Sequence, residues 1–132
     1  MTAEGLIVTP SRFTAKETMD RLESEARARG MAVFARIDHA AGAAEVGMPL
    51  RPTELLIFGA AKAGTPLMQE NQLVGIDLPL KALAFEDESG KAQLAYIDPH
   101  WLAKRHGLGD AAARPATAMA ATLEALAAKA AG

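Results

Sequence analysis

The chain has 132 residues, of which half are apolar and 23% are charged, and this composition indicates one globular domain with a single core. Its formal net charge of −2 at neutral pH offers no general attraction for nucleic acid or for an anionic membrane. The absence of cysteine excludes disulfides, thiolate metal sites and thiol nucleophiles.

The N-terminal residues carry no sign of export. The stretch MTAEGLIVTPSR lacks the basic start and the long apolar segment of a signal peptide. No window of the sequence approaches the roughly 20 apolar residues that a membrane-spanning helix needs. Since the lack of cysteine also fits a reducing compartment, we expect a cytoplasmic protein without a membrane partner or a nucleic-acid partner.

A strand and a helix are expected first. Residues 5–11, GLIVTPS, are typical of a strand that ends at a proline. Thr14 and Glu17 then form a capping box, in which the hydroxyl accepts from a backbone N–H and the carboxylate reaches back. Apolar residues at helical spacing continue as far as Gly30, which favours a helix stop, so we expect a helix over 15–29.

Two further strands are expected next, with a short helix between them. Residues 31–37, MAVFARI, predict the first strand, and Asp38 can cap a short helix over 40–46. Residues 54–60, ELLIFGA, are apolar on both faces, which predicts a strand in the interior of the sheet.

The stretch GAAKAGTP, residues 59–66, follows that strand. Thr65 and Pro66 have the order of a helix cap and a first helical residue. They predict a short helix over 66–71.

A hairpin is expected in the following segment. Residues 73–77 can be extended and lead through Pro79 into a strand over 81–87. Turn residues follow, and residues 91–97, KAQLAYI, return as the second arm. The two arms are therefore predicted to pair antiparallel.

The C-terminal third predicts helices. Asp98 and Pro99 repeat the cap-then-proline order and indicate a helix over 99–106. The alanine-rich segment that follows predicts a helix over 115–130, as a docking helix, a partner contact or a partly frayed tail. We therefore expect one compact domain over residues 1–109 and an alanine-rich helical extension over 110–132.

The order of these elements points to a fold class. Without the two short connecting helices it is β-α-β-β-β-β-α, followed by the C-terminal helix. Four strands in succession, with a hairpin, favour a mostly antiparallel sheet packed on helices. We therefore predict an α+β fold.

Four stretches of the sequence resemble the motifs of a known family, in that family's order: FARIDHAAGAAEVG, TELLIFGAAKAGTPLMQ, GIDLPLKALAFEDESGK and YIDPHWLAKRHGL. Over residues 5–108 the chain thereby resembles the bacterial and archaeal "domain of unknown function three-hundred-and-two" family. The resemblance implies a fold similar to the TATA-binding-protein-like fold, with order β-α-β4-α, and a homodimer. It implies no established reaction. Ala60 and Ala61 replace the Asn and Pro of the family's usual loop, and the segment after Leu108 lies outside the resemblance.

The glycine loop suggests a phosphate site, and two explanations compete. Gly59 and Gly64 have nearly the spacing of a phosphate-binding loop, but Thr65 occupies the place of the lysine that follows the second glycine. Lys62 and the first backbone amides of the expected helix, at 66–68, can instead hold a small anion or a carboxylate. In the competing explanation Thr65 only caps the helix.

Asp77 and Lys81 form the next candidate site. Asp77 lies within the apolar stretch GIDLPL, as a hydrogen-bond acceptor for a neighbouring turn or as a general base with a raised pKa. Lys81 shares its face on an extended chain, but at roughly 13 Å it is too far away to pair with Asp77.

The three histidines give weak metal signals. His100 and His106 are six residues apart on an expected helix and point in different directions, so they cannot chelate one metal together. His106 suits a helix C-terminus. His39 is a polar residue at a strand end, or an acid/base candidate, and we expect no metal and no cofactor.

The function expected from these features is non-catalytic binding of a small, anionic ligand by a homodimer, near residues 58–66. Five side chains and one glycine are the candidate site residues: His39, Lys62, Gly64, Thr65, Asp77 and Lys81. Two alternatives stay open. One is an enzyme that uses Asp77 or His39 as acid or base, and the other is a structural or regulatory interaction module.

Overall fold

A computed structural model describes residues 2–132, and it contains one antiparallel sheet with helices. The elements in chain order are β1 (Leu6–Pro10), α1 (Ala15–Ala28), β2 (Ala32–Asp38), α2 (His39–Glu45), β3 (Thr53–Gly59), α3 (Ala61–Glu70), the 3₁₀ helix η1 (Gln72–Asp77), β4 (Leu80–Glu86), β5 (Ala92–Ile97), α4 (Pro99–Arg105), the 3₁₀ helix η2 (Asp110–Ala112) and α5 (Ala113–Ala131).

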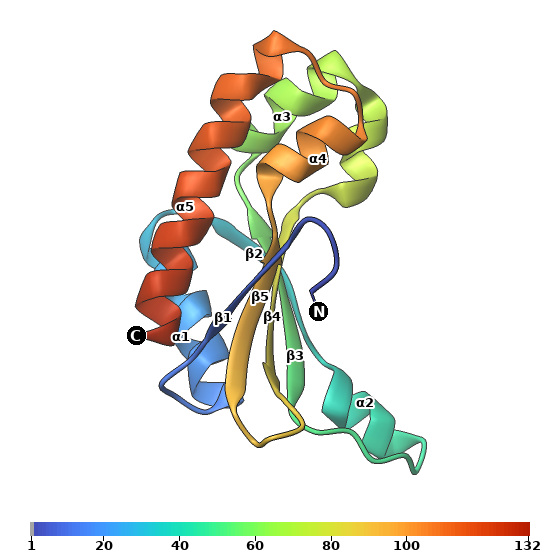
Figure 1. Ribbon diagram of the computed structural model, residues 1–132, viewed down its shortest axis with the longest axis vertical. Helices are drawn as coiled ribbons and strands as arrows, with labels where there is room; N and C mark the ends of the chain where they lie inside the picture. The colour runs from blue at the N-terminus through green and yellow to red at the C-terminus, as the bar shows by residue number, and fades with distance from the viewer. Residues whose placement is uncertain (1) are drawn as a thin grey trace.

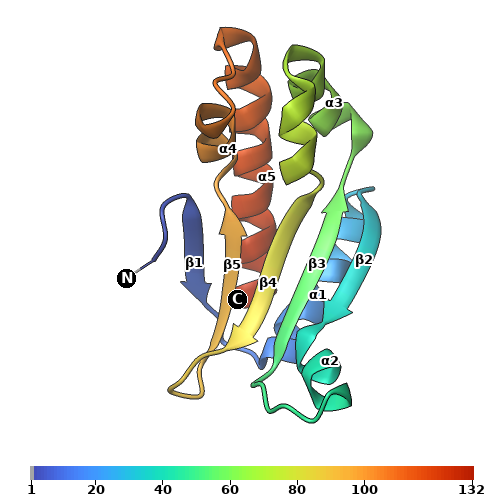
Figure 2. The same ribbon diagram turned by 90° about the vertical axis from the view of Figure 1, so that its right-hand side faces the viewer.

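All neighbouring strands pair antiparallel, in the order β1-β5-β4-β3-β2. This confirms the α+β class and the β-α-β4-α order. Helices α1 and α5 lie together on one face of the sheet, while α3 and α4 lie beyond one end of it (Figure 1). Within residues 2–132, no helix crosses the middle of the other face, as Figure 2 shows. The sheet therefore has a covered and an uncovered face.

The capping box at α1 is present. The Thr14 hydroxyl accepts from the Glu17 amide at 3.1 Å and donates to the Glu17 carboxylate at 3.0 Å. The apolar stripe of this helix, with Met19 and Leu22, is buried against the sheet. Local sequence signals therefore fix both the start and the orientation of α1.

Strand β3 shows how the two faces differ. Leu56 and Phe58 point into the helix-covered face and are fully buried. The intervening Leu55 and Ile57 point to the uncovered face and remain partly exposed, because side chains alternate along a strand. Burying a side chain of this size contributes about 1.5–3 kcal/mol. The stability of the fold therefore comes mainly from the covered face.

Helix α5 completes that covered face. Met119, Leu123 and Leu126 belong to the same buried cluster as the side chains of α1, β3 and β5. Arg21 of α1 donates to the carbonyl of Lys129 at 2.8 Å. The segment expected as an extension, 110–132, is thus a docked helix and not a frayed tail. Its alanines allow it to lie close to α1 and the sheet.

Two local expectations are wrong. Helix α3 begins at Ala61, not at residue 66; Ala60 is its N-cap without a side-chain hydrogen bond, and Pro66 lies inside the helix. Pro66 sits in the second turn, where its missing N–H removes one hydrogen bond, to the carbonyl of residue 62. Residues 73–77 are not extended but belong to η1, because the Asn71 side chain accepts from the Leu73 amide at 3.1 Å and starts a turn.

An ion network closes the β2 edge of the covered face. Arg36 contacts Asp20 at 2.8 Å, Glu23 at 3.2 Å and Glu54 at 2.9 Å. The hydrogen bond from Arg36 lowers the pKa of Asp20, and hydrogen bonds from Arg27 and then Arg36 lower the pKa of Glu23. The same carboxylates raise the pKa of Arg36, with Glu54 first. Lys16 also contacts Asp20, at 3.1 Å, so three positive side chains face the three carboxylates of this cluster.

A tight contact anchors the opposite edge. Gly5, directly before β1, has a φ of +83°, and any side chain there would overlap the ring of Trp101 from α4. Asp98, the N-cap of α4, donates its amide to the Gly5 carbonyl at 2.8 Å. Helix α4 therefore packs closely against the start of the edge strand β1, and only glycine can occupy position 5 at this contact.

Candidate functional site

The glycine stretch lies beside a cavity of about 320 Å³. The cavity is bounded by the end of β3, the first turns of α3, the segment from η1 into β4, and one residue of α5. Gly64 and Thr65 line it, as do Gly59 and Ala60. The structure thus places an opening beside the turn that the sequence singled out.

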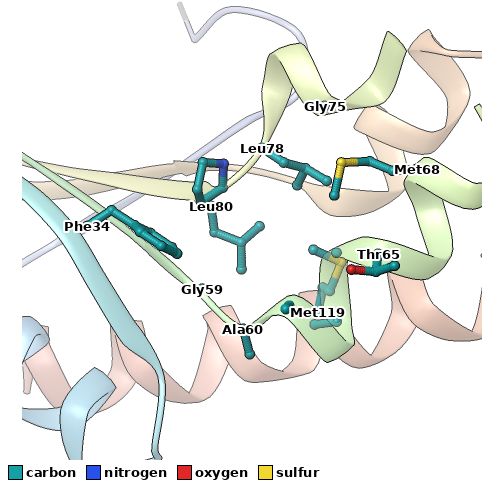
Figure 3. Close-up of a pocket in the computed structure, with 13 residues that line it drawn as sticks. Phe34, Gly59, Ala60, Thr65, Met68, Gly75, Leu78, Leu80 and Met119 are labelled. Carbon is teal, nitrogen blue, oxygen red and sulfur yellow. The ribbon is translucent and has the colours of Figure 1, made fainter. Parts of the chain in front are cut away.

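The wall of this cavity is almost entirely apolar. Figure 3 shows Met68 and Leu78 on one side, Met119 on the opposite side, and Phe34 at one end. The Thr65 hydroxyl is the one side-chain polar group among the lining residues. Such a wall accepts aliphatic or aromatic groups and offers few hydrogen bonds.

A second cavity, of about 470 Å³, adjoins the first. Ala60, Ala63, Leu80 and Met119 line both of them. The rest of the second wall comes from the connection between α1 and β2, from α3 and from α5, and it includes Lys62. The two cavities thus meet around the start of α3 and at Met119 of α5.

The start of α3 does not form the expected amide site at 66–68. These positions lie inside the helix, and Pro66 has no amide hydrogen. The amides of Ala63 and Gly64 donate to the Ala60 carbonyl. Helix geometry leaves the amides of residues 61 and 62 as the first donors without an intrahelical acceptor. Thr65 makes no cap contact, and its side chain belongs to the cavity wall.

Asp77 and Lys81 lie near each other but outside both cavity walls. The Asp77 carboxylate accepts from Arg105 at 2.9 and 3.0 Å and contacts the His106 ring at 2.5 Å. Lys81 donates to the backbone carbonyls of Asp77 at 3.3 Å and Pro79 at 3.1 Å. Asp77 thereby joins η1 to the C-terminal end of α4. Its partners support the hydrogen-bond acceptor role, and sequence reasoning did not identify Arg105 as a partner.

His39 lies far from the other candidates. It opens α2, after the end of β2 that pairs with the start of β3, whereas the cavities lie at the end of β3. His100 contacts Asp98 at 3.2 Å and Thr117 at 3.1 Å and so links α4 to α5. Within residues 2–132, no three His, Cys, Asp or Glu side chains gather where they could hold a metal ion.

Three residues that line the second cavity were not among the candidates from the sequence. Arg29 comes from the C-cap of α1, and Arg114 and Met119 come from α5, and all three line the second cavity. No local pattern marks them, because only the docking of α5 beside α3 brings them to this point. Of the candidate residues, Gly64 and Thr65 line the first cavity and Lys62 lines the second.

The family model for DUF302, "domain of unknown function DUF302", matches residues 7–126. The match reaches into α5, beyond the limit at Leu108 that the sequence motifs suggested. A crystal structure of an uncharacterized conserved DUF302 protein from Bacillus stearothermophilus superposes with a TM-score of 0.84 at 21% identity, over 96% of this chain and 98% of that one. This likeness shows that the two chains share a fold.

Curated relatives add a second comparison. Proteins named fluoride-specific ion channel FluC 1, from Brucella suis biovar 1 (strain 1330) and Brucella abortus biovar 1 (strain 9-941), are 52% identical over 105 residues. The match covers 80% of this chain but only 41% and 39% of those relatives, so the chain spans about two fifths of their length. Among residues 2–132, none of the helices is both long and apolar enough to span a bilayer.

Proposed function

The chain belongs to the DUF302 family of domains of unknown function, and on that premise we propose that it binds a small anionic ligand, without catalysis, at the strand-to-helix turn around residues 58–66. The observation that carries the proposal is the pair of adjoining cavities at this turn, with Lys62 on the wall of one and Thr65 on the wall of the other.

The size and lining of the cavities support binding. Ligand sites commonly measure about 300–1,000 Å³ and combine apolar walls with a few polar groups that orient the ligand. The Lys62 ammonium, the amides of residues 61 and 62, and the Thr65 hydroxyl are the polar groups at this turn. An anion placed there would meet a positive charge and the N-terminal end of α3.

The alternative of an enzyme has less support. Asp77 is engaged by Arg105 and His106, lies outside both cavities, and has a side chain only 15% exposed. His39, the other acid/base candidate, sits at the distant end of β2. A general acid or base must reach the substrate, and neither group lines either of the two cavities at this turn.

Ligand titration followed by NMR tests the proposal. Phosphate, acetate and hexanoate are added to the labelled chain, and the amide shifts of residues 58–66 are followed. We expect saturable shifts there, weakened about threefold to tenfold by Lys62→Ala, as for the loss of one charged contact. Lys104→Ala, at an exposed position of α4, is the matched control. Shifts spread evenly over the surface, or unchanged in Lys62→Ala, would contradict the site.

We further propose that the chain acts as a homodimer, in the cytoplasm, and that the uncovered sheet face forms the interface. Leu6 and Val8 of β1, at 40% and 39% exposure, lie on that face beside Leu83 and Leu55 of the inner strands. A contiguous apolar face of this kind is uncommon on a monomer. The absence of cysteine suits a reducing compartment.

Light scattering tests the dimer. Leu83→Glu places a charge in the middle of the uncovered face and is expected to convert a dimer into a monomer, because a buried unpaired charge is costly. Lys91→Glu, in the turn after β4, is the control and is expected to leave the mass unchanged. A wild-type chain that remains monomeric at high concentration would contradict the dimer.

The similarity to the FluC relatives favours a second candidate, a regulatory interaction module. We propose that the chain modulates a fluoride channel, as an accessory domain that binds the channel protein. The support is a match at 52% identity to proteins named as fluoride channels. In each of these proteins the matching segment covers about two fifths of the length. Fluoride efflux from vesicles that contain such a channel, with and without the added chain, tests the idea, and an unchanged efflux rate would contradict it.

A further inference from the structure

We infer that the ligand of this site is an amphipathic anion: an anionic headgroup beside Arg29, Lys62 and Arg114, with an aliphatic chain in the apolar cavity. The inference rests on the proposed binding function and names the chemical class of ligand. It unites the two adjoining cavities, because each of them provides what the other lacks.

The charge of the second cavity is the first argument. Arg29 comes from the C-cap of α1, Lys62 from α3 and Arg114 from α5, and among the described residues that line this cavity there is no Asp or Glu. Within residues 2–132, no ion pair joins any of these three side chains to a carboxylate. The chain as a whole carries a formal charge of −2, so the three positive charges are concentrated against the overall balance.

The other surface cavities sharpen this argument, because their charges are mixed. One is lined by Arg12, Lys91, Glu17 and Glu86 among others, and another by Asp20, Arg21, Glu25 and Lys129. Both of these grooves therefore combine positive with negative groups. The cation-lined cavity departs from that pattern and attracts an anion.

Phe34 is the second, independent argument. It lies on β2 where the pairing with β3 shifts register between Val33 and Ala35, and such irregularities redirect a side chain. The ring is 60% exposed, yet it lines the apolar cavity (Figure 3). An aliphatic chain that covers this exposed aromatic side chain removes apolar surface from water, and this lowers the free energy of the complex. The apolar cavity is therefore incompletely filled by the protein itself.

The methionines determine what can fill it. Met68 and Met119 face each other across the cavity, and their unbranched side chains adapt to flexible apolar groups. A nucleotide or a sugar phosphate needs hydrogen bonds for its ribose or hydroxyl groups, and Thr65 is the single polar side chain on this wall. The lining thus favours an acyl chain over a polar organic phosphate.

A chain-length series tests the inference directly on the full chain. Acetate, hexanoate and decanoate are titrated by calorimetry, with decanol and decyltrimethylammonium as neutral and cationic counterparts of the same length. We expect the affinity for the carboxylates to rise about fourfold per methylene until the cavity is filled, at about 0.8 kcal/mol each. Decanol is expected to bind at least tenfold more weakly than decanoate, and the cationic compound not at all.

Variants assign the two halves of the ligand. Arg114→Ala and Arg29→Ala are each expected to weaken decanoate about threefold to tenfold without changing the binding of decanol. Gly64→Leu directs a side chain toward Leu78 and Met68, where a Cβ meets only ordinary contacts, and is expected to abolish the dependence on chain length. Lys104→Ala is the control for charge. If Gly64→Leu does not fold, the chain-length series on the wild-type chain still tests the inference.

The outcomes separate this inference from the proposed function. Binding of acetate and decanoate with equal affinity, dependent on Lys62, overturns the amphipathic ligand and leaves anion binding intact. Equal affinity for decanol and decanoate also overturns it. No binding of any anion overturns both. Flotation with vesicles of anionic lipid distinguishes a free acyl anion from a lipid in a membrane. If the chain floats with the vesicles and Arg114→Ala abolishes this, the ligand is a membrane lipid. If the chain does not float, the ligand is the free compound.

Discussion

The two faces of the sheet are built from similar side chains but end in different surroundings. On the covered face Leu56, Phe58 and Leu94 are fully enclosed by α1 and α5. On the uncovered face Leu6, Val8 and Ile37 are 38–40% exposed. The alternation along each strand supplies apolar residues to both faces, but only two helices are long enough to cover one of them (Figure 2).

This difference shows that the strands carry more apolar side chains than the core between the sheet and the helices buries. A sheet with one solvated face normally alternates apolar and polar residues. Here β3 is apolar on both faces, which correctly predicted an interior strand but does not reveal what lies on its second face. The excess on the uncovered face supports the proposed dimer.

Removal of α5 is expected to have the largest effect on stability, because it uncovers the covered face of the sheet. A chain that ends at Gly109 loses Met119, Leu123 and Leu126 from the core and exposes the covered face to water. The loss exceeds the roughly 5–15 kcal/mol by which domains of this kind are stable, so we expect no cooperative unfolding transition. Circular dichroism with a urea titration measures this, and Ala128→Gln, at an exposed position of α5, is the control. A truncated chain that unfolds cooperatively would support the division after residue 109.

Two neighbouring leucines compare the faces with matched chemistry. Leu56→Ala, on the covered face, is expected to cost about 2–5 kcal/mol of unfolding free energy, through lost burial and a cavity. Leu55→Ala, on the uncovered face, is expected to cost about 1 kcal/mol in the monomer, because its side chain is only partly buried. Urea unfolding at low protein concentration measures both. Equal losses at every concentration would show that the faces do not differ.

Acidification probes the network at the edge of the covered face. The pKa values of Asp20 and Glu23 are lowered in the folded chain from ordinary values of 3.8 and 4.5. Their contribution is therefore present above those values and is lost as the pH falls below them. We expect less than about 1 kcal/mol in total, because both carboxylates are partly exposed. Thermal unfolding between pH 7 and pH 3 measures it, and Asp20→Asn is expected to flatten the profile.

Much of the fold could be predicted because its signals are local. The capping box of Thr14 and Glu17, the cap-then-proline order at Asp98 and the apolar run of β3 each depend on residues a few positions apart. The start of α3 was misplaced for a local reason too: Thr65 and Pro66 imitate a helix start, while Ala60 begins the helix without a side-chain cap.

Only some of the residues around the two cavities carry a signal in the sequence. Lys62, Gly64 and Thr65 follow a strand end, where the chain must turn, and this marks them in the sequence. Arg29 and Arg114 are 85 positions apart, and only the packing of α5 beside α1 and α3 brings them to one cavity. Periodicity and spacing indicate which residues are neighbours within one helix or strand. They do not indicate which residues from different elements lie close together in the fold.

The contact between Trp101 and Gly5 gives the molecule an optical reporter. Trp101 is the single tryptophan of the sequence, and its ring lies over the backbone just before β1. Its emission therefore follows the docking of one sheet edge against α4, at a place that lines neither cavity. An emission change that precedes the loss of helical dichroism during unfolding would mark β1 as the strand that detaches first.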